Sequence, residues 1–162
     1  EIFLRGLHNV ENVLAAFAAG LACGADPISM RETVANFKGV EHRIEYVGEI
    51  DGVAFYNDSK ATSVDATVKA LEAMSEGAGK TVLILGGRGK NAPYAPLVPL
   101  IKSSVRAIVV IGEDAENIRT QLAGTTLIVS GDSLENAVEL GLSNAESGDV
   151  VLLAPACASR AR

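Results

Sequence analysis

From residue 53 onward the sequence alternates between short apolar runs and helix-patterned segments. The apolar runs are four to seven residues long, at 53–56, 81–85, 105–111, 125–129 and 150–153. The segments with helical patterns lie between them, at 62–74, 94–103, 115–122 and 132–145. Strands that alternate with helices form a parallel sheet covered by helices on both faces. The alternation therefore predicts a doubly wound, mostly parallel, Rossmann-like α/β sheet.

The start of this sheet has a different pattern. Residues 44–50 and 53–56 flank Asp51-Gly52, a dipeptide that is typical of a tight hairpin turn. We therefore expect a β-hairpin at the start of the sheet.

The first forty residues contain two helical patterns and no strand pattern. The helices are expected at 9–21 and 28–37, and the pattern changes near residue 42. This change predicts a division of the chain into a two-helix segment, 1–40, and an α/β unit, 41–162.

Composition excludes several classes of function. The net charge of −6 is unfavourable for a general nucleic-acid or anionic-membrane surface, and no run of about 18 apolar residues is present. Cys23 and Cys157 lack the spacing of a metal or redox motif, and two histidines are too few for a metal site. We expect a cytoplasmic monomer with no bound metal in this segment, in which both cysteines are reduced and buried.

The turn Asn57-Asp-Ser-Lys-Ala-Thr62, directly after the run 53–56, is rich in chemically active side chains. It places an acceptor (Asp58), a cation (Lys60) and a hydroxyl (Thr62) at the end of a strand. Open α/β sheets bind their ligands beyond the carboxyl ends of their strands. The turn is therefore a candidate ligand-binding loop.

Two other loops should reach the same edge of the sheet, 86–90 and 154–159. Together the three loops offer a set of polar side chains, namely Asp58, Lys60, Thr62, Arg88, Lys90 and Ser159. Lysines with hydroxyl partners suit a small carboxylate or phosphate. The segment 86–90 has neither the spacing of a phosphate loop nor that of a dinucleotide fingerprint.

Two further pairs of residues have two readings each. His42-Arg43 lies where the two-helix segment gives way to the α/β pattern. It is either a solvated hinge or the site of an arginine that clamps a nucleotide at a domain junction. Asn9 and Asn12 are either helix caps or amides that contact a base edge.

Three motifs carry a family resemblance: Gly6-Leu-His-Asn-Val-Glu-Asn12, then Glu41-His-Arg-Ile-Glu45 leading into Asn57-Asp-Ser-Lys-Ala-Thr62, and Leu153-Ala-Pro-Ala-Cys-Ala-Ser159. With them, the chain resembles the D-glutamate-adding branch of the Mur ligase family over essentially its whole length. The resemblance implies that residues 1–40 are the tail of a central ATPase domain and that residues 41–162 form most of the C-terminal ligase domain.

The resemblance also implies a reaction. ATP phosphorylates the carboxylate of UDP-N-acetylmuramoyl-L-alanine, and the amine of D-glutamate attacks the acyl phosphate and expels phosphate. Mg²⁺ would be the metal, with its ligands in sequence upstream of Glu1. A fragment of this kind would be inactive alone.

By resemblance, four residues belong to the amino-acid site. Lys90 and Thr62 match the residues that hold the α-carboxylate of D-glutamate. Ser159 matches a ligand of its side-chain carboxylate, and Lys60 matches a neighbouring lysine of the same site.

Four others match the nucleotide site. Asp58 corresponds to the acceptor for the ribose hydroxyls, and Arg43 to a contact with ribose and phosphate. Asn12 corresponds to an adenine contact, and His42 lies beside this nucleotide edge.

The chain departs from the family pattern after Ser159. Arg160-Ala-Arg162 stands where the family pattern has an apolar residue, Asp and a Phe-containing helix, and by this resemblance we expect this segment to lack the last helix of the domain. Three other hypotheses stay open: a sister ligase for another amino acid, a doubly wound nucleotide-binding module without ligase chemistry, and a structural remnant that binds nothing.

Overall fold

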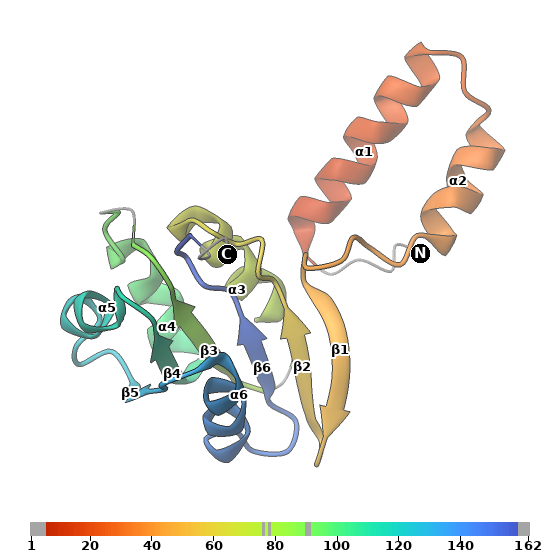
Figure 1. Cartoon of the computed structure of the whole chain (residues 1–162). Helices are drawn as coiled ribbons and strands as arrows, with labels where there is room; N and C mark the ends of the chain where they lie inside the picture. Colours follow the sequence, from red (N-terminus) through yellow and green to blue (C-terminus); the bar gives the residue numbers. More distant parts are fainter. Residues whose placement is uncertain (1–5, 76, 78, 90–91, 159–162) are drawn as a thin grey trace.

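A computed structural model of the chain describes residues 6–75, 77, 79–89 and 92–158. Its described part contains a six-stranded sheet in the order β1-β2-β6-β3-β4-β5 (Figure 1). The strands are β1 Glu45–Ile50, β2 Val53–Asn57, β3 Thr81–Gly86, β4 Val105–Ile111, β5 Leu127–Ser130 and β6 Val150–Leu153. The predicted fold class is confirmed.

Strand direction follows the sequence pattern. β2, β6, β3, β4 and β5 are mutually parallel, and β1 pairs antiparallel with β2 at the edge of the sheet. Asp51 and Gly52 join β1 to β2 with φ angles of 53° and 78°. Two successive positive φ angles are what a two-residue hairpin turn requires, so the predicted hairpin is confirmed.

Helices cover both faces of the sheet, and alternate side chains of each strand face opposite layers. In β3, Leu83 and Leu85 pack into one hydrophobic core, and Val82 and Ile84 pack into the other. The first core is closed by α3, α4 and α5, and the second by α6. The helices of this body are α3 Val64–Met74, η1 Ala95–Leu97, α4 Val98–Ser104, α5 Ala115–Gln121 and α6 Leu134–Ser143.

Two helix boundaries differ from the prediction for a clear reason. The helix predicted at 94–103 is a 3₁₀ turn followed by α4, and each piece has a proline near its start (Pro96 and Pro99). Proline lacks an N–H and is accommodated only in a first turn. The helix predicted from residue 62 begins at Val64, because the Ser63 side chain accepts from the Ala66 amide as an N-cap.

The helices α1 (Leu7–Ala22) and α2 (Pro27–Asn36) stand apart from the α/β body (Figure 1). Neither contains a buried residue, and apolar side chains such as Leu14 and Ile28 are exposed. The expectation of two buried cysteines is half wrong: Cys157 is buried, but Cys23 ends α1 and is exposed. Within the described residues, no helix is long and apolar enough to cross a membrane.

A buried carboxylate organises the amino-terminal edge of the sheet. Asp149, which is 3% exposed, accepts from the backbone amides of Lys80 (2.8 Å) and Glu146 (2.9 Å). Its carboxylate also pairs with Arg106, the second residue of β4. This cluster joins the starts of β3, β4 and β6 at the edge opposite the predicted site.

Candidate functional site

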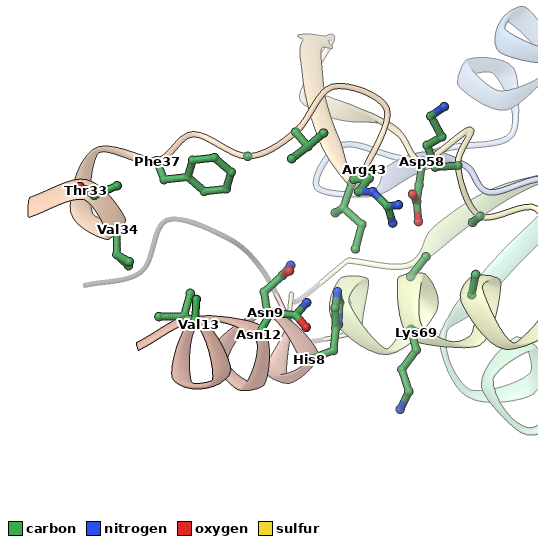
Figure 2. Close-up of a pocket in the computed structure, with 18 residues that line it drawn as sticks. His8, Asn9, Asn12, Val13, Thr33, Val34, Phe37, Arg43, Asp58 and Lys69 are labelled. Atoms are coloured by element: carbon green, nitrogen blue, oxygen red, sulfur yellow. The ribbon is translucent and has the colours of Figure 1, made fainter. Parts of the chain in front are cut away.

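A pocket of about 500 Å³ lies between the α1–α2 pair and the carboxyl end of β2. Its lining includes four of the eight residues that the resemblance assigns to the two sites: Asn12, Arg43, Asp58 and Lys60. His42 precedes Arg43 in the chain and is not part of the lining. Figure 2 shows Asn9 and Asn12 on α1, facing Arg43 and Asp58 across this space. Segments that are far apart in the sequence therefore share one pocket.

Asp58 is the buried polar group of this pocket. It follows β2 directly, its amide donates to the Leu153 carbonyl at the end of β6 (2.8 Å), and it is 7% exposed. Burial raises the pKa of the Asp58 carboxyl above its ordinary value, although the Ile44 amide and the charge of Arg43 oppose this effect. A carboxylate held in this way is a rigid acceptor at the carboxyl edge of the sheet.

The connection between the helical pair and the sheet has strained backbone. His42 and Ile44 have φ angles of 66° and 46°, and a positive φ is a true outlier for a β-branched residue such as Ile44. The His42 amide donates to Glu45 (2.9 Å), and its ring lies 2.9 Å from the Asn57 amide nitrogen. The His42 carbonyl accepts from the Lys60 amide (3.2 Å), so the hinge is tied directly to the candidate ligand loop.

The structure excludes one of the two readings of the asparagines. The N-cap of α1 is Gly6, and no side chain caps this helix, so Asn9 and Asn12 are not helix caps. They line the pocket instead.

His8 and Lys69 also line this pocket and were missed by the sequence reasoning. His8 lies within the quoted Gly6–Asn12 motif, so the motif gave a signal that was not used. Lys69 lies on α3 and is exposed, and nothing in its sequence context distinguishes it from an ordinary surface lysine.

The three predicted loops do meet, as their backbone hydrogen bonds show. The Ala156 amide donates to the Ala61 carbonyl (2.9 Å), which joins the loop after β6 to the turn after β2. The Gly86 amide donates to the Pro155 carbonyl (3.0 Å), and Arg88 and Ala158 bond each other as an isolated bridge. Ala156 adopts a φ of 56°, which turns the loop back toward Ala61.

The residues matched to the amino acid are less completely placed. Thr62 is half-buried two residues before α3 and does not line the pocket that contains Asp58, whereas Lys60 is exposed and does line it. Lys90 and Ser159 lie outside the described residues. Among the residues that are described, no group of three or more His, Cys, Asp or Glu side chains could hold a metal ion.

A second hollow lies where the glycine loop, the segment 86–89 after β3, meets the segments that follow β4 and β5. It is lined by residues of four loops or helix starts: Gly87, Arg88, Ile111, Gly112, Glu113, Asp132, Ser133 and Leu134. Arg88 lines this hollow and not the pocket that Asp58 and Arg43 share.

Comparison with known proteins defines the class to which this fold and site belong. Residues 42–157 match the family model described as "Mur ligase, glutamate ligase domain", and the chain belongs to this family. The match includes His42, the candidate ligand turn and the loop through Cys157.

Individual relatives carry a more specific name. The chain is 49% identical to the UDP-N-acetylmuramoylalanine–D-glutamate ligase of Koribacter versatilis and 51% identical to that of Acidobacterium capsulatum, each over 98% of this chain and 34% of the relative. The chain thus spans about a third of the length of these relatives.

A solved structure supports the fold. The UDP-N-acetylmuramate–alanine ligase of Thermotoga maritima has a TM-score of 0.75 over 94% of this chain and 35% of the other, with 21% sequence identity. At this identity the likeness concerns the fold alone.

Proposed function

We propose that this chain is the C-terminal part of an ATP-dependent ligase that adds D-glutamate to UDP-N-acetylmuramoyl-L-alanine in peptidoglycan precursor synthesis. One observation carries the proposal: Asn12, Arg43 and Asp58 come from separate sequence motifs and line a single pocket. The names of the relatives agree with it, because each is a UDP-N-acetylmuramoylalanine–D-glutamate ligase.

The nucleotide is assigned to this pocket. Asp58 would accept hydrogen bonds from the ribose hydroxyls, and its rigid, buried position suits this role. Arg43 would contact ribose and phosphate, and Asn12 would pair with the adenine edge from α1. His42 would support this edge of the site through its bonds to Glu45 and Asn57.

The amino acid is assigned to the meeting point of the three loops. Lys90 and Thr62 would hold the α-carboxylate of D-glutamate, Ser159 would contact its side-chain carboxylate, and Lys60 would add a second positive charge. A dicarboxylate needs cations and hydroxyl donors of this kind.

The chemistry explains why two substrates must meet here. A carboxylate is a poor electrophile, so the γ-phosphoryl group of ATP is first transferred to it, which releases ADP and leaves an acyl phosphate. The D-glutamate amine then attacks the acyl carbon, inorganic phosphate leaves, and the amine loses a proton. The residues of this chain contribute positioning, which alone can account for several kcal/mol of a reaction barrier (about 7–11).

The assembly of the whole enzyme follows from the same proposal. Residues 1–40 would belong to the central ATPase domain, and the exposed apolar side chains of α1, including Leu7, Leu14 and Leu21, would pack there. Mg²⁺ and the phosphates would be held by sequence outside this chain, and the intact enzyme would act as a cytoplasmic monomer. The chain alone would be inactive.

The test is an assay of the intact parent enzyme for phosphate release that depends on ATP, UDP-N-acetylmuramoyl-L-alanine and D-glutamate. A panel with L-lysine and diaminopimelate distinguishes sister ligases, and preference for either would refute the D-glutamate assignment. Lys90→Ala should abolish turnover at ordinary amino-acid concentrations. Unchanged turnover in this variant would refute the role of Lys90.

A further inference from the structure

One buried hydroxyl joins three loops at the candidate amino-acid site. Tyr94 follows the glycine loop after β3 and is 2% exposed. Its hydroxyl lies 2.6 Å from a carboxylate oxygen of Asp114, in the loop after β4, and 3.1 Å from the sulfur of Cys157, in the loop after β6. Since an ionised carboxylate only accepts, the phenol donates to Asp114, and the Cys157 thiol can donate to the phenol oxygen.

Asp114 is used in an unusual way. It occupies the N-cap position of α5, where an aspartate normally accepts from a backbone amide of the first turn. Here the side chain makes no capping bond. It accepts instead from Tyr94 and from the Asn117 amide (3.1 Å), so local helix stability is not what holds this carboxylate in place.

The carboxylate of Asp114 also lies against the glycine loop. A methyl group built on Gly89 would lie 2.4 Å from the Asp114 carboxyl carbon, so a side chain at this position would displace the Asp114 carboxylate. The Asp114 amide donates to the Gly87 carbonyl (3.1 Å), and the Arg88 amide donates to the Ala158 carbonyl (3.0 Å). The loop that runs into Lys90 therefore lies against Asp114, and it is bonded in turn to the loop after β6, whose Cys157 contacts the Tyr94 hydroxyl.

The ring of Tyr94 is fixed from its backbone side as well. The Tyr94 backbone amide donates to the side-chain oxygen of Gln121 (2.9 Å), and the Gln121 side-chain amide donates to the side-chain oxygen of Asn117 (2.9 Å). The Asn117 side chain donates in turn to the Asp114 carboxylate. Burial, followed by the hydrogen bond to Asp114, raises the pKa of Tyr94 far above its ordinary value. The phenol is thus protonated, and a donor, at neutral pH.

We propose that Tyr94 is a positioning residue for the amino-acid substrate, whose hydroxyl fixes the loops after β3, β4 and β6 relative to one another through Asp114 and Cys157. The proposal rests on the function proposed above. Tyr94 is buried, so its role is indirect. It acts by holding the backbone that leads into Lys90 and Ser159.

The test compares Tyr94→Phe with the unmodified intact enzyme. The phenylalanine keeps the buried ring and removes only the hydroxyl, which leaves the Asp114 carboxylate without a donor. The KM for D-glutamate should rise roughly tenfold, the value expected for one lost hydrogen bond to a charged group, while the KM for ATP stays within about twofold. Tyr46→Phe is the matched control, because Tyr46 lies on β1, is 55% exposed, and should leave both constants unchanged.

Two further measurements separate positioning from general destabilisation. Asp114→Asn combined with Tyr94→Phe should raise the KM for D-glutamate by less than the product of the two single effects, because both remove the same interaction. Amide hydrogen exchange in the intact Tyr94→Phe enzyme should quicken about tenfold at 87–89 and 154–158 and stay unchanged in β3 and β4.

The outcomes are distinguishable from failure of the proposed function. If the enzyme prefers another amino acid, the D-glutamate assignment fails, and Tyr94 is judged by the KM for that amino acid together with the exchange data. An unchanged amino-acid KM overturns the proposal. It is also overturned by an equal rise in both KM values with exchange quickened throughout the sheet, or by an intact enzyme with no amino-acid-dependent activity.

Discussion

The carboxyl group of Asp58 is buried, and burial disfavours its charged form. Its side chain is almost fully enclosed, and burial outweighs the opposing effects of the Ile44 amide and Arg43, so the pKa of its carboxyl is raised. A buried carboxylate costs stability unless its partners compensate fully. Shifted pKa values gather at functional sites, where acceptors are held in place before a ligand arrives.

The change Asp58→Asn should therefore separate function from stability. In the intact enzyme it should raise the KM for ATP about tenfold, because a charged acceptor for hydroxyl groups becomes a neutral one. The KM for D-glutamate should change little. Steady-state kinetics with each substrate varied in turn measures both constants, and an unchanged KM for ATP would contradict the assignment of Asp58.

The same substitution should stabilise this chain at neutral pH. Because the folded pKa of Asp58 lies above its unfolded value of 3.8, ionisation of the carboxyl lowers stability at pH 7, and this cost disappears as the pH falls through the folded pKa. In urea unfolding, the free energy of unfolding of Asp58→Asn should be higher than that of the unmodified chain at pH 7. The two values should converge below pH 3.8. Asp51→Asn, at an exposed turn with positive φ that asparagine tolerates, is the control and should show no such convergence.

At the scale of elements, the start of α3 sets where the candidate ligand turn ends. The Ser63 hydroxyl accepts from the Ala66 amide, and the Ser63 backbone carbonyl accepts from the Thr67 hydroxyl. The Thr67 hydroxyl oxygen also lies 3.2 Å from the Ala154 carbonyl oxygen. The cap of α3 is thereby connected to the loop after β6. A change in this cap should be felt at Thr62.

Ser63→Ala and Ser133→Ala form a matched pair. Each removes the side-chain N-cap of a helix about ten residues long, of α3 and α6 respectively, and each should lower the free energy of unfolding by about 1 kcal/mol. Only Ser63→Ala should also raise the KM for the amino acid in the intact enzyme, by about threefold, as Thr62 loses its fixed position. Equal effects of the two changes on this KM would show that the cap acts through stability alone.

The elements were predictable where one local signal was strong. The bounds of β4 and β6 matched their apolar runs, and Asp51-Gly52 specified the hairpin, because these signals depend on a few adjacent residues. The meeting of the loops also followed, from the rule for carboxyl ends of parallel strands. The reading of Asn9 and Asn12 stayed open, because only the packing of α1 beside the hinge brings these amides to Asp58.

What the sequence did not disclose depends on contacts between distant segments. Nothing near Tyr94 indicates that its hydroxyl meets Asp114 and Cys157, which lie 20 and 63 residues further along the chain. The positive φ of Ile44 is likewise invisible, since a β-branched residue predicts extended backbone. Cys23 was expected in a core, but α1 carries no buried residue in this chain.

At the scale of the molecule, the acid stability of the chain should depend on Asp149. Burial raises the pKa of this carboxyl, but its hydrogen bonds with Arg106 and with the amides of Glu146 and Lys80 more than offset that effect, so the pKa lies below 3.8. Its contribution to stability is therefore fully present above pH 3.8 and is lost as the pH falls through the folded pKa. Asp149→Asn should cost about 2–4 kcal/mol at pH 7, because it removes the negative charge beside Arg106 and one of the two acceptor oxygens, although Arg106 keeps its ion pair with Glu146.

Urea unfolding at pH 7 and at pH 3 measures this dependence. The unmodified chain should be more stable than Asp149→Asn at pH 7, and this difference in unfolding free energy should be smaller at pH 3. For Asp58→Asn the difference at pH 7 should have the opposite sign, with the variant the more stable chain. If the difference is the same at both pH values, Asp149 contributes to stability through its packing and hydrogen-bond geometry and not through its charge.

The α/β body should fold without the two helices that precede it. Both hydrophobic cores are built from residues that follow Arg43, and α1 and α2 bury no side chain. Removal of residues 1–40 should therefore change the free energy of unfolding by no more than about 1 kcal/mol, because little apolar area is lost from the cores. The shortened chain should lose one wall of the pocket, including Asn12, while keeping Asp58 in place.

Urea unfolding followed by far-ultraviolet circular dichroism tests this division of the chain. A cooperative transition with an unchanged midpoint would agree with two units that meet only at the pocket. A broad transition, or a loss of several kcal/mol, would show that the helical pair supports the sheet. In that case the pocket would be part of one folding unit, and the strained φ angles of His42 and Ile44 would be held by its cores and not by the closure of two domains on a nucleotide.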